Sequence, residues 1–160
     1  MSDKGTLSPS LAAEVLAEFE KDWRKDLRRA MPVKERVKIG RRPMPQRAAG
    51  ERSKDFSEVN LGLAAAEAVE EARRCLDCAK PGCIVGCPVR IDIPSFIKLV
   101  EKGEFGTAAA KIREANSLPA ICGRVCPQES QCEETCNLKK ATCVAVAIGN
   151  LERFVSDFER

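Results

Sequence analysis

Residues 75–88 read Cys75-Leu-Asp-Cys78-Ala-Lys-Pro-Gly-Cys83-Ile-Val-Gly-Cys87-Pro88, the first of two close cysteine groups in this chain. The second group reads Cys122-Gly-Arg-Val-Cys126-Pro127 and continues to Cys132 and Cys136. Together they hold all but one of the nine cysteines, and the chain has no histidine. Iron–sulfur clusters are held by cysteine thiolates in short runs whose last cysteine precedes proline. The stretch therefore predicts iron–sulfur centres, which would help to stabilise a small chain with a modest core.

The spacing also bears on how two clusters would share these cysteines. A 4Fe-4S cluster takes one ligand per iron, and Cys75, Cys78 and Cys83 can reach three irons of one cluster. Pro88 disfavours a helix that would bring Cys87 back to the same cluster, so Cys87 can bind a different one. In two-cluster ferredoxins the fourth cysteine of such a run ligates the other cluster. Spacing alone leaves two arrangements open, a crossed one and a simpler one in which each group holds its own cluster.

The rest of the composition indicates a reducing compartment. Nine cysteines are also compatible with a secreted disulfide scaffold, but residues 1–20 carry several charged side chains and no apolar run typical of a signal peptide. The number of cysteines is odd, which would leave one thiol unpaired. No run approaches the length of about 18 apolar residues that a membrane span needs. We therefore expect a cytoplasmic protein with reduced, metal-bound thiols and no membrane span.

The charge is unevenly distributed along the chain. The net charge is +3, whereas residues 21–54 carry 13 Lys or Arg against 4 Asp or Glu, a local charge of +9 that leaves −6 for the remainder. A basic segment on an acidic body predicts a docking segment, and a solvated charged face is the simpler alternative. The segment is broken by prolines and lacks interleaved aromatic residues, so we expect no nucleic-acid partner.

Apolar periodicity predicts the helices before the first cysteine group. Residues 10–30 predict one amphipathic helix after a Ser-Pro start. Residues 32–53, rich in Pro, Gly and basic side chains, predict an extended connector that buries little. The Ala- and Glu-rich residues 63–76 predict a helix that delivers Cys75 and Cys78 from its last turn.

Further helices are predicted beyond that group. Residues 95–102 form an apolar-faced helix after Pro94, stopped by Gly103. Helices are also expected at 107–116 and 144–159, with a helical turn at 130–136. No useful stretch alternates with period two, so no sheet is indicated. The fold class is therefore all-α, with short helices around metal centres, and we divide the chain into an N-terminal helix and basic extended arm (1–54) and a cluster domain (55–160).

Several dispersed motifs, added to the cysteines, match one known domain. They are Ile91-Asp92-Ile93-Pro94-Ser95-Phe96-Ile97, Leu118-Pro119-Ala120, Cys122-Gly123-Arg124-Val125-Cys126-Pro127-Gln128, Cys132-Glu133 and Ala147-Ile148-Gly149-Asn150-Leu151-Glu152-Arg153-Phe154. In these the chain resembles the N-terminal iron–sulfur domain shared by the glutamate synthase small (β) subunit, the large subunit of the NADH-dependent ferredoxin:NADP oxidoreductase, and dihydropyrimidine dehydrogenase. The resemblance covers residues 33–160.

The resemblance implies an α-helical ferredoxin fold with two 4Fe-4S clusters and a crossed ligand partition. One cluster would be held by Cys75, Cys78, Cys83 and Cys136, and the other by Cys87, Cys126, Cys132 and Glu152. Glu152 is included because relatives use a Glu or Gln of the last helix as the fourth ligand; by itself a helical carboxylate is usually a surface residue. Cys122 and Cys143 are left without iron, as small buried thiols.

Arg124 is a candidate cofactor-binding residue. Its guanidinium could donate hydrogen bonds to cluster sulfurs or to a flavin, and such contacts tune the reduction potential. The alternative for Arg124 is a surface arginine in a salt bridge.

The resemblance also implies the functional setting. In the relatives this domain is followed by an FAD- and NAD(P)-binding region with G-x-G-x-x-G turns, and no such motif occurs here. We expect an excised domain, or a stand-alone subunit, that relays electrons between a flavin/NAD(P)H-oxidoreductase domain and a second redox subunit. FAD and NAD(P) would belong to the parent protein, and no catalysis is expected from this chain alone.

Two other functional classes compete with electron transfer. A structural zinc-binding interaction domain would also use paired cysteines, although only one true C-x2-C pair is present. A cluster-based sensor would need a DNA-reading helix, and none is recognisable.

Overall fold

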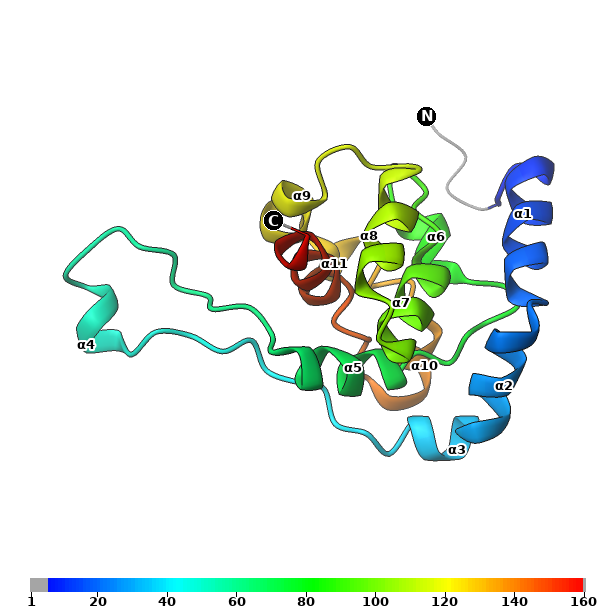
Figure 1. The fold of residues 1–160 in the computed structure, drawn as a ribbon, viewed down its shortest axis with the longest axis horizontal. Helices are drawn as coiled ribbons and strands as arrows, with labels where there is room; N and C mark the ends of the chain where they lie inside the picture. The colour runs from blue at the N-terminus through cyan, green and yellow to red at the C-terminus, as the bar shows by residue number, and fades with distance from the viewer. Residues whose placement is uncertain (1–5, 160) are drawn as a thin grey trace.

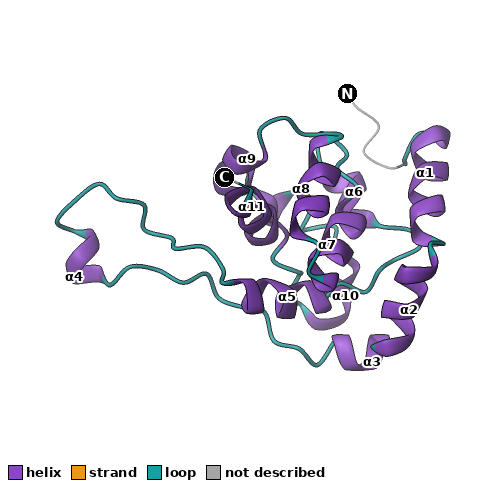
Figure 2. Cartoon of the chain, in the orientation of Figure 1, coloured by secondary structure: helices purple, strands orange, loops and turns teal. Residues whose placement is uncertain are grey.

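The computed structural model describes residues 6–159, which form helices joined by loops (Figures 1 and 2). No strand occurs within that range, apart from one isolated antiparallel bridge between Gln46 and Asn60. The all-α prediction is therefore confirmed. The predicted division into residues 1–54 and 55–160 stays a prediction. Residues 1–5 and 160, at the ends of these two regions, lie outside the described residues.

The helices fall into an N-terminal set and a body. The N-terminal set is α1 (Pro9–Phe19), α2 (Asp22–Ala30), α3 (Val33–Arg36) and α4 (Ala49–Arg52). The body contains α5 (Ala65–Arg73), α6 (Gly82–Gly86), α7 (Ile93–Lys102), α8 (Phe105–Arg113), α9 (Pro119–Val125), a 3-10 turn (Gln128–Ser130), α10 (Asn137–Thr142) and α11 (Ile148–Phe158).

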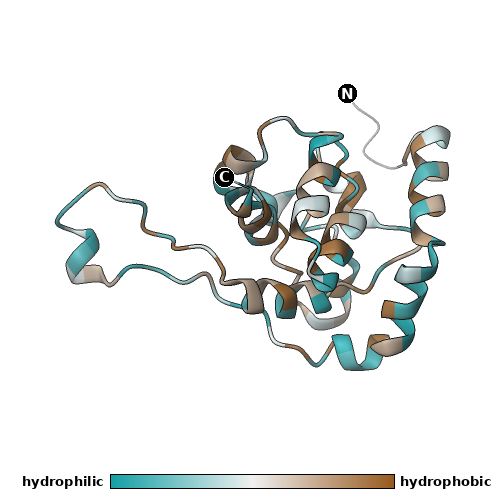
Figure 3. Cartoon of the chain, in the orientation of Figure 1, coloured by the Kyte–Doolittle hydropathy of each residue, from teal (hydrophilic) through white to brown (hydrophobic). Residues whose placement is uncertain are grey.

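The core is built around α7 and α11, whose side chains are buried on nearly every side. Helix α7 packs against α5 and α8, and α11 packs against α9, α8, α5 and α7. Figure 3 shows the strongly hydrophobic ribbon concentrated in this body. Asp92 caps α7 at its N-terminus and Gly103, at φ 84°, ends it, so local capping and stop signals account for this predicted helix.

The predicted helix at 10–30 is interrupted. Lys21 has extended backbone angles between α1 and α2, and Figure 1 shows the two helices following one another along one edge of the body. Helix α2 then presents Arg24, which is only 1% exposed, to the interior. The periodicity of the sequence did not reveal this break because apolar spacing continues across it.

The connector is extended for much of its length, and Figure 1 shows it leaving the body on a long excursion with α4 at its far end. The prediction that it buries little is wrong for Arg36, which is 1% exposed. Arg36 donates to the carbonyl oxygens of Leu27, Met31 and Arg73 and to the carboxylate of Glu101. Full pairing makes the burial of this charge tolerable.

Boundaries around the cysteine groups also differ from prediction. Helix α5 ends at Arg73, so Cys75 and Cys78 lie in the following loop, where Asp77 takes a left-handed conformation (φ 53°) that a helix cannot contain. Helices α6, α9 and α10 were not predicted, and α11 begins at Ile148 rather than at residue 144. Residues 131–135 form turns instead of a helix.

Helix α6 lies directly against the second cysteine group. A Cβ placed on Gly82 would overlap the carbonyl oxygen of Thr135, and one on Gly86 would lie 2.6 Å from the carbonyl oxygen of Gln131. Glycine at these positions allows the backbones to approach so closely. The segment between Cys83 and Cys87 is thereby fixed against the segment between Cys132 and Cys136.

We expect Gly86→Ala to lower the free energy of unfolding by about 1–3 kcal/mol, because the added methyl group must displace the backbone at Gln131. Gly106→Ala in α8 is the matched control, since its Cβ would meet nothing within 4 Å; its stability should be unchanged or slightly raised. Denaturant unfolding of both variants checks this, and equal midpoints would contradict the close packing of α6.

Candidate metal centre

All nine cysteines are free thiols in the structure, and Cys143 is the exposed one. The structure therefore contains no disulfide among them. The remaining eight are buried or half-buried and belong to the two groups. They gather in two sets, each of which draws on both groups.

The first set consists of Cys75, Cys78, Cys83 and Cys136. Burial raises the pKa of Cys75 to about 11, with a smaller contribution from Cys78. Burial also raises the pKa of Cys83, and Cys75, Cys136 and Cys78, followed by Cys132 of the second set, add to that rise. The pKa of Cys78 is raised first by burial and then by Cys136. These four thiols are therefore electrostatic neighbours, although Cys136 is remote in sequence.

The second set consists of Cys87, Cys126, Cys132 and Glu152, which line one cavity together with Cys122. Burial raises the pKa of Cys126 to about 11, and Cys122, then Glu152 and Cys87, add to that rise. Burial raises the pKa of Cys132 to about 12, and Cys87, Glu133 and Glu152 add to that rise. Helix α9 brings Cys122 and Cys126 here because Gly123 packs against α11, where an added Cβ would lie 2.7 Å from the backbone nitrogen of Arg153.

Glu152 is buried on α11, with 6% of its surface exposed. Burial raises its pKa to about 7, opposed by a hydrogen bond that Asn116 donates from Nδ2 to Oε1 over 2.9 Å. No Lys or Arg of residues 6–159 forms an ion pair with it. A buried carboxylate is costly without a positive partner, and a metal in the cavity would offset that cost. Sequence reasoning did not single out Asn116, which carries no recognisable motif.

The donors of both sets fit iron–sulfur clusters. Thiolates are the ordinary ligands of such clusters, and binding iron removes the proton that burial otherwise keeps on each thiol. In the second set the carboxylate of Glu152 would supply the fourth donor, an oxygen in addition to three sulfurs. Among residues 6–159 no three His, Cys, Asp or Glu side chains converge closely enough to hold a single metal ion.

Cys122 and Cys143 differ from the small buried thiols that were expected. Cys122 is half-buried and lines the second cavity, with its Sγ 3.7 Å from Asn116 Oδ1. Cys143 is exposed, in a left-handed conformation (φ 63°) at the end of α10, so the prediction of burial is wrong there. The chain turns outward at this point, and no core packing covers the side chain.

Arg124 lies on α9 and is paired with carboxylates. Its Nε donates to Glu58 Oε1 over 2.8 Å, and its Nη2 donates to Asp157 Oδ2 over 2.8 Å. It also donates to the carbonyl oxygen of Ala120. The side chain thus joins α9 to α11 and to Glu58, which lies in the loop before α5. Its role toward a cofactor stays a prediction.

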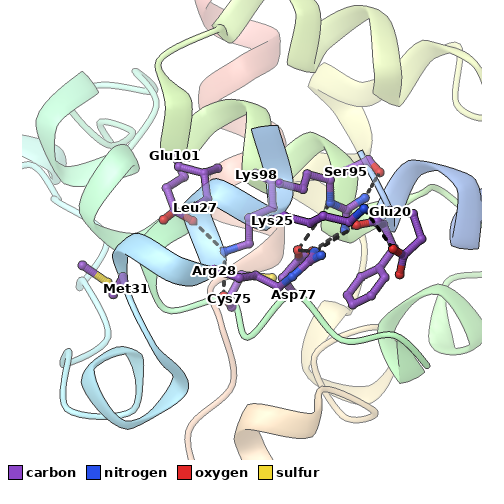
Figure 4. Close-up of polar contacts among 12 residues, drawn as sticks. Glu20, Lys25, Leu27, Arg28, Met31, Cys75, Asp77, Ser95, Lys98 and Glu101 are labelled. Carbon is purple, nitrogen blue, oxygen red and sulfur yellow. Dashed lines mark hydrogen bonds and ion pairs between the residues drawn. The ribbon is translucent and has the colours of Figure 1, made fainter. Parts of the chain in front are cut away.

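A buried charged network around the Cys75–Cys78 loop was missed by sequence reasoning. Arg24 and Arg28 of α2 pair with Asp77, and Lys98 donates to the carbonyl oxygen of Cys75 (Figure 4). The only signal in the sequence was an acidic residue, Asp77, between Cys75 and Cys78, and its presence does not indicate which basic residues pair with it.

None of the helices in residues 6–159 combines the length and the apolar character that crossing a membrane requires.

Comparisons with known proteins add a family and several relatives. Residues 52–160 match the family described as dihydropyrimidine dehydrogenase domain II, 4Fe-4S cluster. The chain is 38% identical over 121 residues to the glutamate synthase (NADPH) small chain of Azospirillum brasilense, which covers 76% of this chain and 25% of the relative. It is 45% identical over 111 residues to the putative oxidoreductase UacF of Escherichia coli K12, covering 69% of this chain and 17% of the relative.

A third relative is the NAD-dependent dihydropyrimidine dehydrogenase subunit PreT of Escherichia coli K12, 42% identical over 93 residues, with 58% of this chain and 22% of the relative covered. The chain thus spans a quarter or less of the length of these three relatives.

Proposed function

This chain belongs to the family of dihydropyrimidine dehydrogenase 4Fe-4S domains, and from that premise we propose that it carries two 4Fe-4S clusters and relays electrons within a larger oxidoreductase. The observation that carries the proposal is the gathering of the cysteines into two sets, each drawn from both groups. Cys75, Cys78, Cys83 and Cys136 would hold one cluster. Cys87, Cys126, Cys132 and Glu152 would hold the other.

Bound clusters supply one-electron transfer, and the chain supplies the setting for it. Two cysteines of each set are buried in the same core as the side chains of α7 and α11, namely Cys75, Cys136, Cys87 and Cys132, and this burial limits the access of water. The contact between α6 and residues 131–135 fixes the distance between the sets. Asn116 orients the carboxylate of Glu152 by a hydrogen bond.

The proposed partners are a flavin/NAD(P)-binding domain or subunit and a second redox subunit. The relatives support this, because their names include NADPH-dependent glutamate synthase and NAD-dependent dihydropyrimidine dehydrogenase, and they are about four times longer than the matched region or more. Helix α9 beside the second cavity also exposes Leu118, Ile121 and Val125, an apolar surface that suits a docking domain. The FAD and NAD(P) would be bound by those partners, in a cytoplasmic enzyme.

Anaerobic purification with iron and acid-labile sulfide analysis tests the proposal. We expect about eight iron and eight sulfide per chain, as two 4Fe-4S clusters require, and absorbance near 400 nm that bleaches with dithionite. The zinc-binding interaction domain predicts zinc, no sulfide and no bleaching. That second outcome, if it persisted after cluster reconstitution, would overturn the electron-transfer function.

For Glu152 we expect Glu152→Ala to disturb one cluster and leave the other intact, because the second set would lose its only oxygen donor. Electron paramagnetic resonance of the reduced protein should show one altered and one unchanged signal, with less iron per chain. Glu114→Ala is the control, since that carboxylate is exposed and lies at the end of α8. Unchanged iron and unchanged signals in Glu152→Ala would remove Glu152 from the ligand set.

A further inference from the structure

The N-terminal helices, which precede the family match at residues 52–160, form part of the environment of the first cysteine set. Helices α2 and α3 lie against the loop that carries Cys75 and Cys78 and against α7 (Figure 4). The contacts include several buried charges, in addition to the apolar packing of Trp23 and Val37 against the core. This is unusual for an appended segment, because a buried charge is costly unless it is paired.

Asp77, between the two cysteines, is the centre of the first half of this network. Its side chain is fully buried and accepts hydrogen bonds from Arg24 and Arg28. Arg24 also donates from Nη1 to Ser95 Oγ over 2.8 Å, and Arg28 donates from Nη1 to Asp77 Oδ2 over 2.6 Å and to the carbonyl oxygen of Phe19 over 3.0 Å. The left-handed turn at Asp77 is therefore held from one side by α2.

Lys98 of α7 is the centre of the second half. It is fully buried and donates from Nζ to the carbonyl oxygen of Cys75 over 2.7 Å and to Glu101 Oε2 over 2.6 Å. Glu101 Oε2 also accepts from Arg36 Nη1 over 2.9 Å. The backbone of the cysteine loop is thereby fixed from its other side.

The network has an excess of positive charge. Four cations, Arg24, Arg28, Arg36 and Lys98, face two carboxylates, Asp77 and Glu101. The outer pair of Glu20 and Lys25, 3.2 Å apart, is neutral overall. One of these cations contacts the cysteine loop directly, because Lys98 Nζ lies 2.7 Å from the carbonyl oxygen of Cys75.

We propose that Arg24 and Arg28 of α2, together with Lys98, are positioning residues for the Cys75–Cys78 loop and raise the reduction potential of the cluster held by the first cysteine set. Reduction adds one electron and hence one negative charge to a cluster. A buried positive excess stabilises that added charge, in a medium where it is poorly screened. The inference rests on the proposed function, because it requires a cluster at this set.

Potentiometric titration of the whole chain with dithionite, followed by electron paramagnetic resonance, tests the inference on Arg28→Gln. Arg28 is 23% exposed, so its replacement is milder than that of Arg24. We expect one cluster to become harder to reduce by roughly tenfold, a shift of about 59 mV to more negative potential. The other cluster should keep its midpoint.

Two matched variants separate charge from structure. Arg28→Lys keeps the charge and should keep most of the potential. Arg29→Gln removes the same charge from the same helix, but Arg29 is 77% exposed and pairs with Asp26, so both midpoints should stay unchanged. Hydrogen exchange of the amides at residues 76–78 should be faster in Arg28→Gln than in Arg29→Gln, which reports the positioning role without use of the clusters.

Two results would overturn the inference. If the unaltered chain contains both clusters and Arg28→Gln leaves both midpoints unchanged, the charge effect is absent while the proposed function stands. If Arg28→Gln and Arg29→Gln shift the midpoint potential of the same cluster equally, the shift comes from the overall charge of the surface and not from the buried network. Absence of iron and sulfide from the unaltered chain would instead refute the proposed function, and this inference with it.

Discussion

Cys136→Ala is expected to abolish the cluster held with Cys75, Cys78 and Cys83 and to leave the other cluster in place. Cys132→Ala, only four residues earlier, is expected to do the reverse. The reason is that Cys132 lines the cavity with Cys87, Cys126 and Glu152, whereas Cys136 is absent from that lining and raises the pKa of Cys78 and Cys83. Each variant should lose about half of its iron and sulfide, and each should lose a different resonance signal on reduction.

The crossed arrangement can be tested further with the first group. Cys83→Ala should remove the same signal as Cys136→Ala, and Cys87→Ala the same signal as Cys132→Ala. If each group held its own cluster, Cys83→Ala and Cys87→Ala would instead affect one and the same signal. Cys143→Ala is the control, because that thiol is exposed, and its iron content and signals should match those of the unaltered chain.

Arg24→Met is expected to lower the free energy of unfolding by about 3 kcal/mol, at the lower end of the range for breaking a buried ion pair. The side chain is 1% exposed, and its removal leaves Asp77 with Arg28 alone and Ser95 without its donor. Methionine fills much of the volume, so the loss is chiefly that of pairing rather than of packing.

Denaturant unfolding followed by circular dichroism measures this effect. Arg29→Met is the matched control on the same helix. We expect its free energy of unfolding to stay within about 0.5 kcal/mol of that of the unaltered chain, as for exposed positions generally. Equal midpoints for Arg24→Met and Arg29→Met would show that the buried pair contributes no net stability, as is found for some buried salt bridges.

Local signals predicted the central helices well. Pro94 at the start of α7 and Gly103 at its end act within a few residues, and the structure places the helix at Ile93–Lys102. Prediction failed around the cysteines, where α6, α9 and α10 were missed. Those short helices are stabilised by contacts such as Gly86 on the backbone of Gln131, which no local pattern reveals, because short helices depend on tertiary packing.

The sequence shows a concentration of positive charge in residues 21–54. The structure shows which carboxylates pair with three of these arginines. Arg24, Arg36 and Arg41 pair with Asp77, Glu101 and Glu133 of the body. The segment therefore docks, in part, on its own chain. Partners that lie 53 to 92 residues apart cannot be matched from composition, because every acidic residue of the body is an equally good candidate.

The sequence by itself determined the all-α class and the presence of two cysteine groups without histidine, because helix periodicity and ligand chemistry are local properties. It left open whether the groups were separate or crossed. Only the tertiary structure decided which thiols are neighbours, since the packing of α6 on residues 131–135 and of α9 on α11 brings together residues that spacing keeps apart. The same packing buries Glu152, which by sequence is an ordinary helical carboxylate, in a cavity that four cysteines also line.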